Sequence, residues 1–218
     1  DLINAASAYD QGYTGKGVLI GLLDTPMRED HPELSGKFEV IASLDKDGHL
    51  VANPTTWTQD VSHGTHVASI MAAKKDDIGM HGVAFDSNVV GQVYIGLQSY
   101  YFADDKKFFQ AHPEIKILNN SWNGMAVDKS FVPNGEVYSV QEAKKLAMTE
   151  GVKPHSGQLV KWAIENPNSL AVVAAANDGW VSPSFMGMLP RYYGSELGNW
   201  VTVVSLNPLD ATRKDGTI

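Results

Sequence analysis

Short apolar runs alternate with longer amphipathic stretches along this chain. Five runs rich in Val, Ile, Leu and Ala have the length of β-strands and lack polar alternation, which indicates strands buried on both faces. They cover residues 18–23, 88–95, 115–119, 170–175 and 201–205. Helices are predicted between them over residues 64–73, roughly 97–109 and 157–165. The alternation predicts an α/β fold of three layers, with a mostly parallel, twisted sheet and helices on both of its faces.

Two stretches interrupt this alternation. Residues 127–153 are polar and irregular, with a helical patch near residues 140–148, and are interpreted as a surface insertion within a single domain. Met186 and Met188 lie in a Met-rich, aromatic stretch that could line a pocket, but the interpretation favoured is a flexible apolar surface loop.

The composition narrows the class of protein. The chain has 218 residues, of which 43% are apolar and 19% charged, and this is typical of a globular chain that buries its own core. Lys and Arg number 17 against 25 Asp and Glu, so the net charge of −8 argues against a nucleic-acid-binding protein. Because the chain has no cysteine, disulfides, thiolate metal sites and a cysteine nucleophile are excluded.

No segment predicts a membrane span or an export signal. The apolar runs are far shorter than the ~20 residues that cross a bilayer. The chain begins at Asp1 without a basic and apolar leader. The protein is therefore interpreted either as intracellular or as the processed form of an exported protein.

Polar side chains follow three of the predicted strands directly. Asp24, Ser121 and Asn177 each come at the carboxyl end of an apolar run. In open α/β sheets, functional residues gather at this edge. Each residue type also fits a turn, and Asp24 stands shortly before Pro26, so position alone leaves both interpretations open.

Two histidines lie at the start of the first predicted helix. His63 and His66 are three residues apart and share one helix face, and Ser62 or Asp60 can cap the helix. His66 alone fits a core histidine or one that supports a neighbouring site. A metal site would pair both histidines with Asp24, although metal-binding helices more often use a spacing of four.

The motifs together resemble the subtilisin-like serine proteases, the subtilase or peptidase S8 family. The segments that carry the resemblance are, in order, Asp24-Thr, His63-Gly-Thr-His66-Val-Ala, Asn119-Asn-Ser121 and Ala175-Ala-Asn177. Supporting segments are residues 15–20, His31-Pro-Glu-Leu34, residues 79–84 and residues 190–205. The opening residues 3–17 and the Asn-Asn-Ser-Trp segment are most similar to passenger domains of Gram-negative autotransporter subtilases.

The resemblance implies a serine endopeptidase that needs no cofactor for its chemistry. Asp24 and His63 would belong to an Asp-His-Ser triad, and Asn177 would stabilise the oxyanion. The peptide substrate would lie along Ser121, Trp122 and Asn123 on one side and along Ala174, Ala175 and Ala176 on the other. Asn123 and Ala176 stand where the family usually has Gly, and Ala176 would narrow the substrate wall.

The nucleophilic serine that the family requires is not recognisable. No Ser follows Gly-Thr and precedes a small apolar helix start, so we expect residues 1–218 to be the N-terminal portion of one subtilisin-like domain. This portion alone would be inactive and would expose apolar surface, with the C-terminal portion as its partner. The alternatives are a catalytically dead relative that binds peptides or mediates adhesion, and a metal-dependent hydrolase.

The resemblance also implies a location and a structural ion. The protein would be secreted or lie on the bacterial surface, its signal peptide having been removed. Glu33 and Asp76 resemble calcium ligands of the family by position. The alternative at Asp76 is a solvated acidic turn, because Lys74 and Lys75 precede it. Pro26, which replaces a usual Gly, is expected to reshape the turn beside Asp24.

Overall fold

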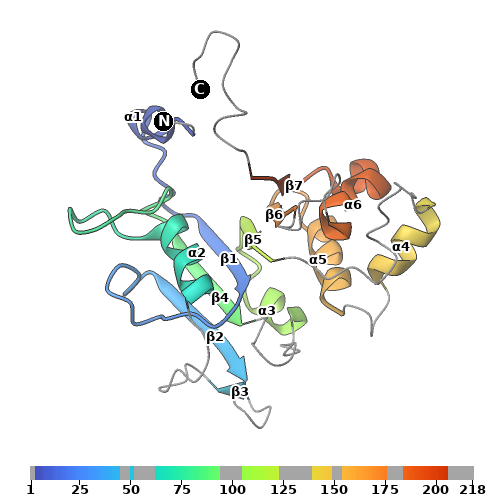
Figure 1. Ribbon diagram of the computed structural model, residues 1–218, viewed down its shortest axis with the longest axis horizontal. Helices are drawn as coiled ribbons and strands as arrows, with labels where there is room; N and C mark the ends of the chain where they lie inside the picture. Colours follow the sequence, from blue (N-terminus) through green and yellow to red (C-terminus); the bar gives the residue numbers. More distant parts are fainter. Residues whose placement is uncertain are drawn as a thin grey trace.

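A mostly parallel sheet of seven strands forms the middle of the molecule (Figure 1). The computed structural model describes residues 3–44, 50–51, 62–93, 105–122, 139–148, 154–175 and 184–205. The strands are β1 (Leu19–Asp24), β2 (Phe38–Leu44), β3 (Leu50–Val51), β4 (Asn88–Val93), β5 (Ile117–Asn120), β6 (Leu170–Ala174) and β7 (Trp200–Val203). Their order is β3-β2-β4-β1-β5-β6-β7, and only the pairing of β2 with β3 is antiparallel.

Helices cover both faces of the sheet. They are α1 (Ala5–Asp10), α2 (Ser62–Ala72), α3 (Asp105–Ala111), α4 (Val140–Met148), α5 (Pro154–Glu165) and α6 (Phe185–Tyr193), followed by the 3₁₀ turn η1 (Gly194–Leu197). Leu22 of β1 packs in a core with α2, whereas the next residue, Leu23, packs in a second core with α3, α5 and α6. Successive side chains of a strand point to opposite faces, so the two cores lie on opposite sides of the sheet.

The structure confirms the predicted α/β, three-layer fold. Each of the five predicted strands is present, and so are the helices predicted over residues 64–73 and 157–165. The helical patch near residues 140–148 is α4, whose Ala143 and Ala147 are fully buried. Residues 127–138 and 149–153 of the proposed insertion lie outside the described residues.

The flexible loop expected around Met186 and Met188 is wrong. These residues belong to helix α6, in which Met186 and Leu189 are buried and Met188 is partly buried. The Ser184 hydroxyl accepts a hydrogen bond from the Gly187 N–H at 3.2 Å and caps the first turn. The methionines therefore fill the core beneath α6 instead of covering a surface.

One face of the sheet is only partly covered. Trp200 and Thr202 of β7 turn towards the α6 side, where the Thr202 hydroxyl donates to the Gly187 carbonyl at 2.7 Å. Val201 and Val203 therefore point to the α2 side, where they are 42% and 51% exposed. Along the described parts of the chain, no helix is both long and apolar enough to cross a membrane.

Candidate active site

Asp24 ends the central strand β1 with its side chain only 1% exposed. Its Oδ1 lies 2.6 Å from Nδ1 of His63 and also accepts a hydrogen bond from the Thr25 N–H at 2.7 Å. Burial raises the pKa of the Asp24 carboxyl above its ordinary value, and the hydrogen bond from His63 opposes this rise. The sheet therefore holds a buried carboxylate that is hydrogen-bonded to one imidazole.

His63 is the second residue of α2, and its side chain is 53% exposed. An ionised carboxylate only accepts hydrogen bonds, so Nδ1 of the neutral ring carries the proton in this pair. Nε2 is then left as an acceptor nitrogen on a ring that solvent can reach. A fixed tautomer with a basic Nε2 is what a general base requires.

Thr25 and Gly64 connect the two partners, and the sequence analysis assigned no role to either. The Thr25 hydroxyl donates to Asp24 Oδ1 at 3.2 Å and accepts from the Gly64 N–H at 2.9 Å. A Cβ on Gly64 would come within 2.6 Å of both Met27 Cγ and the Thr25 carbonyl oxygen. The sequence signal for these two residues was their position, because Thr25 directly follows Asp24 and Gly64 directly follows His63.

The second oxygen of Asp24 differs from the first. Oδ2 is buried and has no hydrogen-bond partner among the described residues. β5 runs parallel to β1 with Asn119 opposite Leu22, and Ser121 follows directly after the end of β5. The Asn119 amide donates to the Ser121 hydroxyl at 2.9 Å.

The other substrate-binding candidates lie at the ends of β5 and β6. Trp122 packs partly against the core on the α6 side, and Ala174 ends β6. The Ala175 N–H donates to the Val203 carbonyl, and the Ala175 carbonyl accepts from the Ser184 N–H and keeps a second lone pair. Three candidates, Asn123, Ala176 and Asn177, lie outside the described residues.

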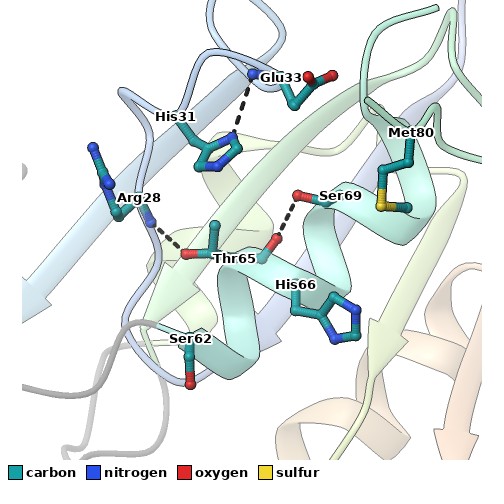
Figure 2. Close-up of a pocket in the computed structure, with 8 residues that line it drawn as sticks. All are labelled: Arg28, His31, Glu33, Ser62, Thr65, His66, Ser69 and Met80. Carbon is teal, nitrogen blue, oxygen red and sulfur yellow. Dashed lines mark hydrogen bonds between the residues drawn. The ribbon is translucent and has the colours of Figure 1, made fainter. Parts of the chain in front are cut away.

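His66 does not join Asp24 and His63. It lines a cavity of about 330 Å³ between α2 and the loop that follows β1 (Figure 2). The lining residues are Arg28, His31, Glu33, Ser62, Thr65, His66, Ser69 and Met80. His66 is exposed, so the interpretation as a core histidine is wrong. The part of the chain that the structure describes contains no group of three His, Cys, Asp or Glu side chains placed to hold a metal ion.

Glu33 and the loop that carries Asp76 lie close together. Oε2 of Glu33 is buried and has no partner among the described residues, and a Cβ on Gly79 would lie 3.3 Å from Oε1. The Lys74 N–H donates to the Glu33 carbonyl at 3.0 Å. Asp76 accepts from the Ile78 N–H at 3.2 Å within the loop. A buried carboxylate oxygen beside a loop of carbonyl groups suits the oxygen ligands that Ca²⁺ prefers.

Solved structures with a similar fold are proteases. The serine protease of Aeromonas sobria, in complex with a chaperone, matches with a TM-score of 0.54 at 20% identity, covering 76% of this chain and 26% of that chain. The prenylagaramide maturation protease PagA matches with a TM-score of 0.59 at 17% identity, covering 98% of this chain and 62% of that chain. At these identities the likeness concerns the fold.

Sequence comparisons identify the family. An extracellular serine protease of Serratia marcescens is 30% identical over 235 residues, which cover 95% of this chain and 21% of the relative. A second such protease of the same organism is 29% identical and covers 96% of this chain and 22% of the relative. The chain thus spans about a fifth of the length of these relatives. A sequence model of the subtilase family matches residues 15–214, and the chain therefore belongs to this family of serine proteases.

Proposed function

We propose that this chain supplies the acid–base half of a serine endopeptidase. The observation that carries the proposal is the 2.6 Å contact between Asp24 Oδ1 and His63 Nδ1. It joins a buried carboxylate to an imidazole that solvent and a reacting group can reach. Membership of the subtilase family supports the same reaction class.

In the proposed reaction His63 is the general base. Its Nε2 takes the proton of a serine hydroxyl as the oxygen attacks the scissile carbonyl, and later returns it to the leaving amine. Asp24 holds the tautomer through Nδ1 and stabilises the imidazolium that forms. Asn177 is proposed to donate its amide N–H to the oxyanion, with Ser121 to Asn123 and Ala174 to Ala176 along the substrate.

The nucleophilic serine is proposed to come from polypeptide other than the described residues. Val201 and Val203 on β7 and Ile70 on α2 are each more than 40% exposed and lie on the side of the sheet that carries His63. Apolar surface of this kind is normally covered. We propose that a segment covering this surface also extends to the imidazole and carries the nucleophile, so that this chain alone would be inactive.

Fluorophosphonate labelling, read on a denaturing gel, tests this function. Label on a longer or associated polypeptide that contains this chain, lost in His63→Ala and kept in His31→Ala, is the expected result. Label on the 218-residue chain itself would overturn the proposal about the nucleophile. Peptide binding without label on any species would favour a non-catalytic binding module.

The proposed setting is outside the cell. The Serratia marcescens relatives are named extracellular serine proteases, which supports secretion or display on the bacterial surface as an autotransporter passenger. The proposed substrate is a protein or peptide, and neither nucleic acid nor a membrane span takes part.

A structural calcium ion is proposed at Glu33. The carboxylate of Glu33, the carbonyl groups of the loop over residues 74–80 and Asp76 would hold it, and it would stabilise the loop without entering the reaction. EDTA is expected to lower the midpoint of thermal unfolding, and added Ca²⁺ to restore it. The proposal would be contradicted if EDTA left the midpoint of thermal unfolding unchanged and Glu33→Gln unfolded at the same midpoint as the unaltered chain.

A further inference from the structure

The loop that follows β1 is tied to the first turn of α2 at two successive helix residues. The Gly64 N–H donates to the Thr25 hydroxyl at 2.9 Å, and the Arg28 N–H donates to the Thr65 hydroxyl at 2.9 Å (Figure 2 shows the second bond). In one bond the helix supplies the N–H, and in the other the loop supplies it. Loop and helix are thus joined through two threonine hydroxyls, at the two residues that directly follow His63.

Between these two bonds the loop packs directly on the helix. Met27 is fully buried, and a Cβ on Gly64 would come within 2.6 Å of Met27 Cγ and of the Thr25 carbonyl oxygen. Contact this close leaves the first turn little room to shift, but one hydrogen bond at Gly64 alone would let the turn rotate about that point. Successive helix residues lie about 100° apart around the axis, so a second bond at the next residue fixes the rotation.

The rotation of this turn decides where the His63 ring points. The ring is half exposed, so packing constrains it little, whereas its Nδ1 approaches Asp24 Oδ1 to 2.6 Å. A catalytic group that is misplaced by about 1 Å can slow a reaction by about 100-fold. A bond that fixes the first turn therefore bears directly on the contact between His63 and Asp24.

We propose that Thr65 is a positioning residue for His63. By accepting the Arg28 N–H, its hydroxyl sets the rotation of the first turn of α2 and so holds the imidazole against the Asp24 carboxylate. The inference rests on the proposed function, in which this contact makes His63 the general base. Thr65 and Arg28 both line the cavity in Figure 2, so water can reach the Arg28 N–H when the hydroxyl is removed, and we expect the variant to fold.

The test replaces Thr65 by Val, which keeps the shape of the side chain and removes its hydroxyl. The low-field proton resonance of the His63 Nδ1–H, assigned by its loss in His63→Ala, reports the hydrogen bond to Asp24 in the full protein. In Thr65→Val this resonance is expected to move upfield and to broaden. Fluorophosphonate labelling is expected to slow by about tenfold, the size of one lost hydrogen bond.

Two further variants separate positioning from packing. Thr65→Ser keeps the hydroxyl and is expected to restore both the resonance and the labelling rate. Ser69→Ala removes a hydroxyl that donates to the Thr65 carbonyl at 2.8 Å, a bond that stays within α2, and is expected to change neither (Figure 2). An unchanged resonance in Thr65→Val, or an equal change in Thr65→Ser or Ser69→Ala, overturns the proposal.

The role of Thr65 and the enzymatic function can fail separately, because the resonance requires no nucleophile. An altered resonance in Thr65→Val, with no fluorophosphonate label on any polypeptide that contains this chain, would refute the enzymatic function and retain the role of Thr65. Label on the full protein, with the same resonance and labelling rate in Thr65→Val, would refute the role of Thr65 and retain the function.

Discussion

The two ends of helix α2 are held by different chemistry. At its first turn, Gly64 donates its N–H to the Thr25 hydroxyl, and His63 contacts the buried Asp24 carboxylate. At its last turn, the Lys37 ammonium donates to the Ala72 carbonyl at 2.7 Å, and the Gly82 N–H donates to the Ala73 carbonyl at 2.9 Å.

The difference lies in what each end leaves unsatisfied. A cation at the carboxyl end of a helix matches the helix dipole and uses carbonyls that have no partner within the helix. The amino end instead faces an imidazole that is half exposed and a carboxylate with one oxygen that has no partner within the described parts of the chain. The comparison indicates that the last turn anchors the helix. The first turn instead keeps His63 available as a base, at the cost of burying the Asp24 carboxylate.

The largest expected effect comes from replacing the carboxylate at the first turn. Asp24→Asn should lower kcat/KM of the active protease by about 10⁴-fold, the size seen when the carboxylate of a Ser-His-Asp triad becomes an amide. Asp30→Asn, at an exposed residue paired with Arg28, serves as the control and should retain activity. If kcat/KM of Asp24→Asn fell by less than tenfold, the two ends of α2 would not differ in the way proposed.

Added methyl groups test both ends by overpacking. Gly64→Ala and Gly82→Ala should each lower the free energy of unfolding by about 1–3 kcal/mol. At Gly64 the methyl meets Met27 and Thr25, and at Gly82 it collides with the backbone of Ala72 and Ala73. Gly64→Ala should also slow fluorophosphonate labelling, whereas Gly82→Ala should not.

Gly198→Ala is the matched control for these denaturation measurements. Its Cβ would meet only the Ser195 carbonyl oxygen at 3.4 Å, so its stability should stay near that of the unaltered chain. Equal losses of labelling in Gly64→Ala and Gly82→Ala would contradict the comparison.

Removing the Thr25 hydroxyl should weaken the first turn without disrupting it. Thr25→Val deprives Asp24 of one donor and Gly64 of its acceptor, and should slow labelling by about tenfold. Thr25→Ser keeps the hydroxyl and should label at the original rate. A Thr25→Ser variant as slow as Thr25→Val would mean that the methyl group, and not the hydroxyl, matters.

At the last turn, loss of the cation should affect stability alone. Lys37→Met should lower the free energy of unfolding by about 1 kcal/mol, because the cost of burying the ammonium offsets part of its hydrogen bonding. Burial lowers the pKa of Lys37, consistent with this offset. The exposed Lys16→Met is the control, and a change in labelling rate for Lys37→Met would contradict the assignment.

The smallest effect concerns pH. Burial raises the pKa of Asp24 in the folded chain above the ordinary 3.8. At pH values between 3.8 and this raised pKa, the folded chain therefore binds more protons than the unfolded chain. Ionised Asp24 thus lowers stability above its folded pKa, and this cost disappears as the pH falls below 3.8. The stability of Asp24→Asn relative to the unaltered chain should therefore decrease from pH 7 to pH 4 in urea denaturation. An increase would contradict the assignment.

Much of the site could be predicted because its chemistry is local in sequence. Asp24 at a strand end and His63 at a helix start are fixed by short motifs, and the structure brings them together. The bond from Gly64 to Thr25 could not be predicted, since it depends on how α2 meets the turn after β1. Pro26 is buried, and the reshaped turn expected there stays a prediction.

Helix α6 shows the opposite failure. Two methionines in an aromatic stretch favoured a flexible apolar loop, although Met186, Leu189 and Tyr193 recur at helical spacing. Only the packing against the sheet decides that this spacing is a buried face. Strand β2 was likewise not predicted, because its pairing with β4 is long-range.

The exposed valines of β7 have a consequence for the strength of the Asp24–His63 pair. The half-exposed His63 ring lies in contact with water, which screens its interaction with the buried Asp24 carboxylate. β7 lies three strands away from β1, so covering Val201 and Val203 would strengthen charge interactions only as far as the cover extends towards His63. The extent of that cover therefore sets the effective dielectric constant around Asp24 and His63, and with it the strength of their interaction.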